Sequence, residues 1–278
     1  DLHLSLRRQR QMCIRDSDKG VMLSHSNLVA NLYQFTELVP SGEEDTLIAV
    51  LPFYHIYGMT VILNSALSHG ATVVCMSRFD LEQFLVLMQK HEVTRAHLVP
   101  PIVLALAKHP MVEGYAFPKL KTIMSGAAPL GPELAEDCAR RLGCTVKQGY
   151  GLTETSPVTH LNPEPPGRVV PGSIGICIPN TECRIVDYET GKDLGTGMQG
   201  ELWIRGPQVM KGYLNNEEAT NQTIDPEGWL KTGDIAEVDE DGYFKIVDRV
   251  KELIKYKGFQ VAPAELEALL LTHPTIAD

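Results

Sequence analysis

Gln148-Gly149-Tyr150-Gly151-Leu152-Thr153-Glu154-Thr155-Ser156-Pro157 directly follows a short segment, 145–148, that we predict to be a buried strand. The glycines permit an unusual turn, Tyr150 offers a ring for stacking, and Thr153 offers a hydroxyl group to a phosphate. Glu154 supplies carboxylate oxygens, the ligand type that Mg²⁺ takes. Because ligands of open α/β sheets lie at the carboxyl ends of strands, this stretch predicts a binding loop; a plain turn with solvent-facing side chains is the alternative.

Upstream of this loop, strand-like and helix-like segments alternate from residue 18 to residue 150. Short apolar runs predict buried strands, and segments of helical spacing predict helices, the first of them N-capped by Ser26. The predicted strands are 47–52, 71–76, 96–99, 122–124 and 145–148, and the predicted helices are 27–38, 58–67, 81–91, 102–108 and 131–142. This alternation predicts the α/β class, with a mostly parallel sheet and flanking helices.

Downstream, the pattern changes at about Gly172. Short alternating runs such as 182–186 and 200–205 are separated by glycine-rich turns, with no long helix between them. They predict a small antiparallel barrel or sheet that extends to about Val247. A helix is predicted at 263–271, in the start of a C-terminal α+β subdomain. The expected division is a leader (1–17), an α/β part (18–170), a β-barrel part (171–248), and a hinge with the start of a small domain (249–278).

Composition narrows the possible functions. The chain has 278 residues, 44% of them hydrophobic, and a net charge of −10. This charge argues against nucleic acid or an anionic membrane surface as a general partner, and the apolar runs are too short for a membrane span. The cysteines form no CxxC pair and show no metal-ligand spacing, so we expect buried thiols in a reducing, cytoplasmic setting rather than a structural disulfide.

Residues 1–17 differ from the rest of the chain. They are basic at 6–11, and no apolar core of signal-peptide length follows. We expect a non-native or out-of-frame leader and exclude it from the fold prediction.

Polar groups recur in three further segments. Ser125-Gly126-Ala127-Ala128-Pro129 lies between a strand and a helix, and its small side chains let a ring or a phosphate approach the backbone. Asp234, in Thr232-Gly233-Asp234, has two acceptor oxygens for the hydroxyls of a ribose, and Arg249 could hold the same sugar or a phosphate. A tight turn and a surface Asp–Arg pair, which stabilises by at most about 1 kcal/mol, are the plainer alternatives.

His55 lies between two tyrosines at a predicted strand-to-helix corner, and a histidine in such a place is more often structural. The lysines at 251, 255 and 257 form a basic cluster in an acidic chain. The alternative there is a solvated strand edge, where lysines hinder aggregation.

In order and spacing, these segments resemble those of the adenylate-forming enzymes: the acyl-CoA synthetases, beetle luciferases and peptide-synthetase adenylation domains. Segments 54–58, 125–129, 148–154 and 256–263 are most similar to 4-coumarate–CoA ligases, and the resemblance extends from about residue 19 to residue 278. It implies that ATP and Mg²⁺ activate a carboxylate to an acyl-adenylate and pyrophosphate. A small C-terminal domain then rotates, and coenzyme A attacks to give the thioester.

The resemblance also implies roles for individual residues. Those that would line the adenine and acyl sites are Gly126, Ala127, Ala128, Gly149, Tyr150 and Gly151. Thr153 would contact the α-phosphate and Glu154 would bind Mg²⁺. Asp234 and Arg249 would hold the ribose. His55 would be the gate histidine beside the carboxylate, and Lys251 would be the hinge of the small domain. Lys255 and Gln260 would approach the adenylate in one of the two conformations.

The acyl pocket leaves two readings open. Tyr54, Tyr57, Pro157 and Val158 match positions that line it in coumarate-type enzymes, and Tyr57 could donate a hydrogen bond to a phenolic hydroxyl. A tyrosine packed in a fatty-acyl tunnel is the alternative. We therefore expect a 4-coumarate- or cinnamate-type ligase, with a medium- or long-chain fatty acyl-CoA synthetase or a luciferase-like enzyme as alternatives.

Two departures from the family pattern bear on activity. Of the Ser/Thr/Gly-rich phosphate loop, only residues 19–25 match, and Ile14-Arg15-Asp16-Ser17-Asp18 places acids where the β- and γ-phosphates would lie. The family's catalytic lysine would follow residue 278, and losing one such group costs about 10²–10³ in rate. The upstream third of the large domain is missing as well. We expect poor adenylation by this chain alone, and a truncated, non-catalytic nucleotide-binding product is the third hypothesis.

Overall fold

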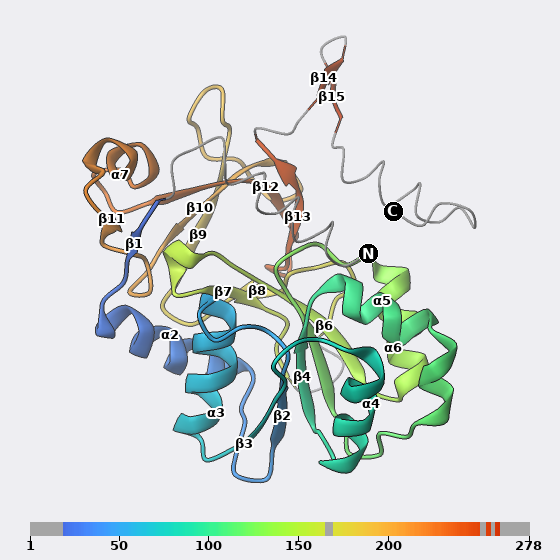
Figure 1. Cartoon of the computed structure of the whole chain (residues 1–278). Helices are drawn as coiled ribbons and strands as arrows, with labels where there is room; N and C mark the ends of the chain where they lie inside the picture. Colours follow the sequence, from blue (N-terminus) through green and yellow to red (C-terminus); the bar gives the residue numbers. More distant parts are fainter. Residues whose placement is uncertain (1–18, 165–168, 251–253, 257–258, 262–278) are drawn as a thin grey trace.

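The computed structural model describes residues 19–164 and 169–250, together with two short strands at 254–256 and 259–261. Figure 1 shows two parts: a sheet flanked by helices, and a smaller, mostly β part next to it. The predicted leader (1–17), Lys251 and the predicted helix at 263–271 lie outside the described residues. In the described part of the chain, no helix is long and apolar enough to cross a membrane.

The larger sheet has seven strands in the order β3-β2-β4-β5-β6-β7-β8. Its parallel strands are β2 (Thr46–Ala49), β3 (Thr72–Cys75), β4 (Arg95–Leu98), β5 (Thr122–Ser125) and β6 (Thr145–Gly151). Two antiparallel strands extend it, β7 (Val158–Leu161) and β8 (Ile176–Cys177). The predicted α/β class with a mostly parallel sheet is confirmed.

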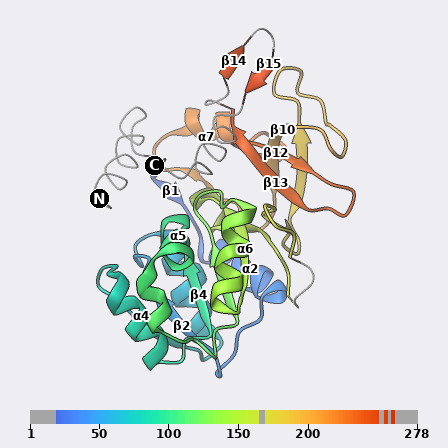
Figure 2. The same cartoon turned by 90° about the vertical axis from the view of Figure 1, so that its right-hand side faces the viewer.

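Helices cover both faces of this sheet (Figures 1 and 2). The two faces can be told apart along β5, where adjacent side chains point to opposite sides. Ile123 packs in the core cluster with Phe84 of α4 and Leu106 of α5, whereas Met124 packs with Phe35 of α2. The helices are α2 (His25–Leu38), α3 (Ser65–Ser68), α4 (Leu81–Lys90), α5 (Pro100–Lys108) and α6 (Pro132–Leu142), and a 3₁₀ turn, η2 (Pro110–Gly114), follows α5.

Two details differ from the predictions. The N-cap of α2 is Ser24 and not Ser26: the backbone N of Asn27 donates to Ser24 Oγ (3.1 Å), and the backbone N of Ser24 donates to Asn27 Oδ1 (2.9 Å). This reciprocal pair satisfies two helix-end donors, which Ser26 inside the first turn cannot do. The predicted helix at 58–67 is a π-helix, η1 (Tyr57–Asn64), continued by α3. π-Helical turns are rare and occur frequently at functional sites.

The smaller part is an antiparallel sheet in the order β13-β12-β10-β9. Its strands are β9 (Glu182–Val186), β10 (Gly200–Arg205), β12 (Leu230–Val238) and β13 (Phe244–Arg249). Inward-facing residues such as Ile185, Leu202 and Ala236 form its core. Among the described residues these strands pair as an open four-stranded sheet, so the expected barrel is not found there, although the antiparallel pairing is.

Short elements complete the fold. β1 (Val21–Met22) pairs with β11 (Gly212–Tyr213), and α7 (Glu217–Thr223) packs beside them. None of these was predicted; two-residue strands such as β1 and β11 carry no periodic signal. β14 (Ile254–Tyr256) and β15 (Phe259–Val261) form an antiparallel pair in which Lys255 stands opposite Gln260.

Candidate active site

A cavity of about 290 Å³ lies at the carboxyl ends of β5 and β6. These strands are parallel neighbours, so the loops that follow them meet at one edge of the sheet. The residues that border the cavity are Gly126 and Ala127 of the loop after β5, Gly149, Tyr150 and Gly151 at the end of β6, and Thr153 and Glu154 just beyond it. Ala128 is exposed and does not border it.

The Gln148 side chain ties the two loops together. Its Nε2 donates to the carbonyl O of Leu130 (3.0 Å), and its Oε1 accepts from the backbone N of Leu130 (2.8 Å). Gln148 is buried on β6, whereas Leu130 closes the loop after β5. The pair therefore holds the loop that contains Gly126 against the end of β6 that contains Gly149.

Glycines are required in this region because neighbouring atoms approach their backbone. A Cβ atom at Gly126 would lie 2.9 Å from Cε1 of Tyr57, and one at Gly151 would lie 2.1 Å from the carbonyl O of Pro157. Real Cβ atoms essentially never come within 3.0 Å of another heavy atom, so a side chain at either position would displace the Tyr57 ring or the Pro157 backbone. Ala127 itself has a positive φ of 71°, which is uncommon for a residue with a side chain.

The loop after β6 turns sharply through η3 (Thr153–Thr155), and the Ser156–Pro157 peptide bond is cis. Thr155 Oγ1 donates to the carbonyl O of Pro157 (2.6 Å) and accepts from the backbone N of Leu152 (3.0 Å), which holds the turn closed. Thr153 is exposed at the cavity edge. Glu154 accepts a hydrogen bond at Oε1 from the hydroxyl of Tyr213 (2.8 Å).

The hydroxyl of Thr153 and the carboxylate of Glu154 together present hard oxygen donors at the same rim. Mg²⁺ prefers such donors and keeps the rest of its octahedron for water and phosphate oxygens. These residues therefore fit a magnesium ion that arrives with a nucleotide.

Tyr150, Asp234 and Arg249 form a connected polar group between the two sheets. The Tyr150 hydroxyl donates to Asp234 Oδ2 (2.5 Å), and Arg249 Nε donates to Asp234 Oδ1 (3.2 Å). Asp234 and Arg249 are opposite each other on β12 and β13. Burial and the neighbouring Asp234 raise the pKa of Tyr150 well above its usual value, so it stays a donor. A carboxylate oxygen can accept more than one hydrogen bond, so a carboxylate is a group that can also bind sugar hydroxyls.

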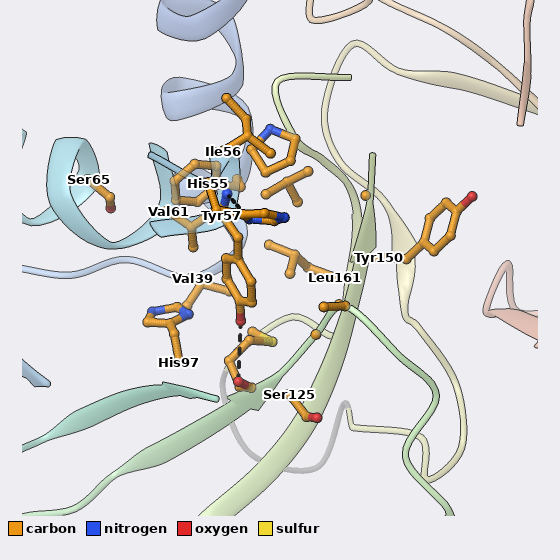
Figure 3. Close-up of a pocket in the computed structure, with 18 of the residues that line it drawn as sticks. Val39, His55, Ile56, Tyr57, Val61, Ser65, His97, Ser125, Tyr150 and Leu161 are labelled. Carbon is orange, nitrogen blue, oxygen red and sulfur yellow. Dashed lines mark hydrogen bonds between the residues drawn. The ribbon is translucent and has the colours of Figure 1, made fainter. Parts of the chain in front are cut away.

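Figure 3 shows an apolar chamber within the cavity. Tyr57, Val61 and Leu161 point toward one another there, whereas the Tyr150 ring points away from them. Pro157 and Val158 also line the cavity. The Tyr57 hydroxyl donates to the carbonyl O of Met124 (3.4 Å). Tyr54 does not border the cavity; its side chain is 94% exposed.

His55 lies at the mouth of the chamber. Its Nδ1 accepts from the backbone N of Tyr57 (3.1 Å), so Nε2 carries the proton in the neutral ring. Desolvation lowers the pKa of His55 below its usual value, which favours the neutral form. The side chain is thereby held at the start of η1 and can donate a hydrogen bond from Nε2.

His97 is a lining residue that the sequence analysis missed. It is 9% exposed on β4, its ring centroid lies 5.9 Å from that of Tyr57, and its buried Nδ1 has no hydrogen-bond partner among the described residues. Burial, together with the positive charges of Arg95 and Lys147, lowers the pKa of His97 to about 4. The available signal was the alternation of Arg95 and His97 in a strand, which places both side chains on one face.

A buried ionic network lies beneath His97. Arg95 pairs with Asp45 (Nε to Oδ2, 3.1 Å) and with Glu164 (Nη1 to Oε1, 2.9 Å), and Lys147 pairs with the same Glu164 oxygen (3.1 Å). Since every charge has an opposite partner, the floor of the cavity is fixed without an uncompensated charge.

Comparison with known proteins supplies the class. Residues 17–214 match the family model described as AMP-binding enzyme, and the chain belongs to this family. The resemblance seen in the motifs is thereby confirmed.

Curated relatives are coumarate ligases by name. The chain is 50% identical over 264 residues to probable 4-coumarate–CoA ligase 1 of Dictyostelium discoideum, which covers 94% of the chain and 48% of the relative. It is 50% identical over 269 residues to 4-coumarate–CoA ligase 1 of Petroselinum crispum, which covers 94% of the chain and 49% of the relative. The chain spans about half the length of the curated relatives it matches.

Solved structures agree in fold. ATP-bound MatB from Rhodopseudomonas palustris has a TM-score of 0.85 at 33% identity, over 93% of this chain and 51% of that one. MenE from Bacillus subtilis, an O-succinylbenzoate coenzyme A synthetase in complex with ATP and magnesium ion, has a TM-score of 0.83 at 31% identity, over 94% and 53%.

Proposed function

We propose that this chain is part of an AMP-forming carboxylate–CoA ligase that acts on a 4-coumarate- or cinnamate-type acid. The observation that carries the proposal is a single cavity with an apolar chamber at one end and glycine-lined strand-end loops at the other. The chamber suits an acyl group, and the loops suit a nucleotide. The names of the curated relatives support the same reaction.

In the proposed reaction, the substrate carboxylate attacks the α-phosphorus of ATP, and pyrophosphate leaves. Thr153 donates a hydrogen bond to the α-phosphate, and Asp234 accepts from the ribose hydroxyls beside Arg249. Glu154 would hold Mg²⁺, which would offset charge on the phosphates. Thioester formation follows as the thiol of coenzyme A attacks the acyl carbon and AMP leaves.

The remaining roles are also proposals. His55 orients the carboxylate at the mouth of the acyl chamber, from which coenzyme A would enter. Lys255 and Gln260, opposite each other on β14 and β15, approach the adenylate, and Lys251 acts as the hinge. We also assign the reaction to the cytoplasm, because the five cysteines that the structure describes are all free thiols.

The floor of the chamber favours an aromatic acid with a hydroxyl group over a fatty acid. Tyr57 makes only a long hydrogen bond, and the buried Nδ1 of His97 has no partner among the described residues. A buried polar atom without a partner costs about 1–3 kcal/mol, and a phenolic hydroxyl could remove that cost. An alkyl chain could not.

A thermal-shift titration tests the proposal. A non-hydrolysable coumaroyl-adenylate analogue at about 100 times its Kd should stabilise the fold by about 2.7 kcal/mol, with a larger shift than AMP gives. The Asp234→Ala variant should weaken the response to both ligands. A larger shift with a long-chain acyl-adenylate analogue would instead favour the fatty-acyl alternative, and a cooperative melt with no shift would refute a working site.

A further inference from the structure

Three potential metal ligands from three strands meet between the two sheets. His160 on β7, Cys177 on β8 and Cys183 on β9 have ligand atoms that all lie within 4.8 Å of one another. The Sγ atoms of Cys177 and Cys183 are each 3.4 Å from His160 Nε2. The sequence analysis found no metal-ligand spacing because the cysteines are not close in sequence and the histidine belongs to another strand.

The separations suit a tetrahedral ion. Bonds of about 2.3 Å to sulfur and about 2.0–2.1 Å to nitrogen, at a tetrahedral angle, place sulfur and nitrogen about 3.6 Å apart. The observed distances of 3.4 Å are close to that value. Both Sγ atoms lie close to the same nitrogen, His160 Nε2, so one ion placed among the three atoms would contact all three ligands.

The histidine is held in the tautomer that ligation needs. Thr159 Oγ1 donates its only proton to the carbonyl O of Tyr150 (3.3 Å) and lies 3.0 Å from His160 Nδ1. With its proton on the Tyr150 carbonyl, the hydroxyl accepts from Nδ1–H, and this tautomer of His160 leaves the Nε2 lone pair facing the two sulfurs. Such outer-sphere partners are typical of metal-binding histidines.

The surroundings favour a soft divalent ion whose charge is neutralised by its ligands. His160 is fully buried and packs against the Phe244 ring, with centroids 4.6 Å apart, and both cysteines are partly buried. Two thiolates neutralise a divalent cation, so no net charge enters this apolar layer. Thiolate and imidazole ligands select zinc-like ions over Mg²⁺ or Ca²⁺.

We propose that His160, Cys177 and Cys183 bind one Zn²⁺ ion, with a fourth position filled by water from the partly exposed cysteine side. The two thiols each release a proton on binding, and no bond other than the S–H bonds breaks. Because β7 and β8 belong to the seven-stranded sheet and β9 to the four-stranded sheet, the ion would join the two sheets. The plain alternative is a metal-free cluster in which the thiols only hydrogen-bond to His160.

Cobalt substitution tests the site. The reduced, tag-free chain of residues 1–278, stripped of metal, is titrated with Co²⁺ and watched for the near-ultraviolet thiolate-to-cobalt charge-transfer band. The proposal expects a band that saturates at one ion per chain and is displaced by Zn²⁺, with two protons released. It is overturned if wild-type protein shows no band and Zn²⁺ does not raise its Tm.

Variants locate the ligands. Cys177→Ser and Cys183→Ser should each lose the band, and Thr159→Val should weaken affinity by about 10–100-fold while Thr159→Ser keeps it. Cys75→Ser, at an exposed cysteine outside the cluster, is the matched control and should change nothing. If a ligand variant fails to fold, the comparison of Thr159→Val with Thr159→Ser still tests the site. The band of Thr159→Val should saturate at a higher Co²⁺ concentration than the band of Thr159→Ser. An unchanged band in Cys177→Ser or Cys183→Ser would contradict the assignment.

Discussion

Tyr57 and His97 set the chemistry at the bottom of the apolar chamber. Tyr57 extends from η1, His97 from β4, and their rings meet edge to face. Burial keeps the tyrosine protonated and the histidine neutral, so both can exchange hydrogen bonds with an uncharged hydroxyl. A charged terminus on the substrate would be poorly matched to this pair of neutral groups.

His97→Leu tests whether the buried ring nitrogen contacts the phenolic hydroxyl of the substrate. The substitution removes the buried ring nitrogen and keeps an apolar wall, so it should weaken binding of the coumaroyl-adenylate analogue by roughly tenfold, about one hydrogen bond. The cinnamoyl analogue, which lacks the phenolic hydroxyl, should bind as before. Calorimetric titration of both ligands checks this. An equal loss of affinity for both analogues would show that His97 does not bind the phenolic hydroxyl.

At the scale of elements, the ends of α2 and β2 depend on single polar side chains. Ser24 caps α2 through a reciprocal pair with Asn27, whose Nδ2 also donates to the carbonyl O of Pro207 (2.7 Å). Asp45, just before β2, is 1% exposed and accepts from Thr94 (2.8 Å) and Lys121 (2.9 Å) at Oδ1 and from Arg95 (3.1 Å) at Oδ2. The hydrogen bonds of Asn27 and of Asp45 therefore connect segments that are distant in sequence.

Ser24→Ala should lower the free energy of unfolding by about 1 kcal/mol, because the helix loses its side-chain acceptor. Ser26→Ala is the matched control: this residue is inside the first turn, where alanine has the higher helix propensity, and stability should stay equal or rise slightly. Urea unfolding of the two variants measures the difference. A larger loss for Ser26→Ala would reassign the cap.

Asp45 should make stability depend on acid pH. Burial alone would raise its pKa, but hydrogen bonds from Lys121 and Thr94 and the charge of Arg95 outweigh burial and lower the pKa from 3.8 to about 2. Because the folded-state pKa lies below the unfolded value, the carboxylate stabilises the fold above the unfolded pKa, and this contribution is lost as pH falls toward about 2.

Urea unfolding between neutral pH and pH about 2 checks this expectation. Asp45→Asn should reduce stability at neutral pH and flatten the acid dependence, whereas Asp241→Asn, at an exposed carboxylate outside the network, should keep the wild-type slope. Parallel curves for wild type and Asp45→Asn would contradict the expectation.

At the scale of the whole molecule, polar contacts join the two sheets. Tyr150 on β6 bonds to Asp234 on β12, and Phe244 on β13 forms an isolated bridge with Gly175 next to β8. The proposed nucleotide site lies at this junction, so its geometry depends on how the sheets are joined. His160, on the neighbouring strand β7, is the register partner of Tyr150.

Tyr150→Phe removes the hydroxyl that holds Asp234 while keeping the ring. A buried carboxylate that loses a donor costs about 1–3 kcal/mol, so the free energy of unfolding should fall by that order and AMP should bind more weakly. Tyr33→Phe, at a side chain that is 77% exposed, is the matched control and should be neutral. Denaturant unfolding and AMP titration of both variants check this. Unchanged AMP affinity in Tyr150→Phe would separate this contact from the nucleotide site.

The sequence by itself determined the succession of strands and helices along the chain and the two glycine-containing segments at strand ends. These depend on local signals, namely apolar runs, glycines and polar residues at strand ends, and the family resemblance supplied the proposed reaction. Only the tertiary structure decided that His97 enters the chamber, that Tyr54 stays outside it, that Ser24 caps α2, and that His160, Cys177 and Cys183 meet. Each of these depends on how the chain packs in three dimensions, and no local pattern encodes a contact between strands that other segments separate.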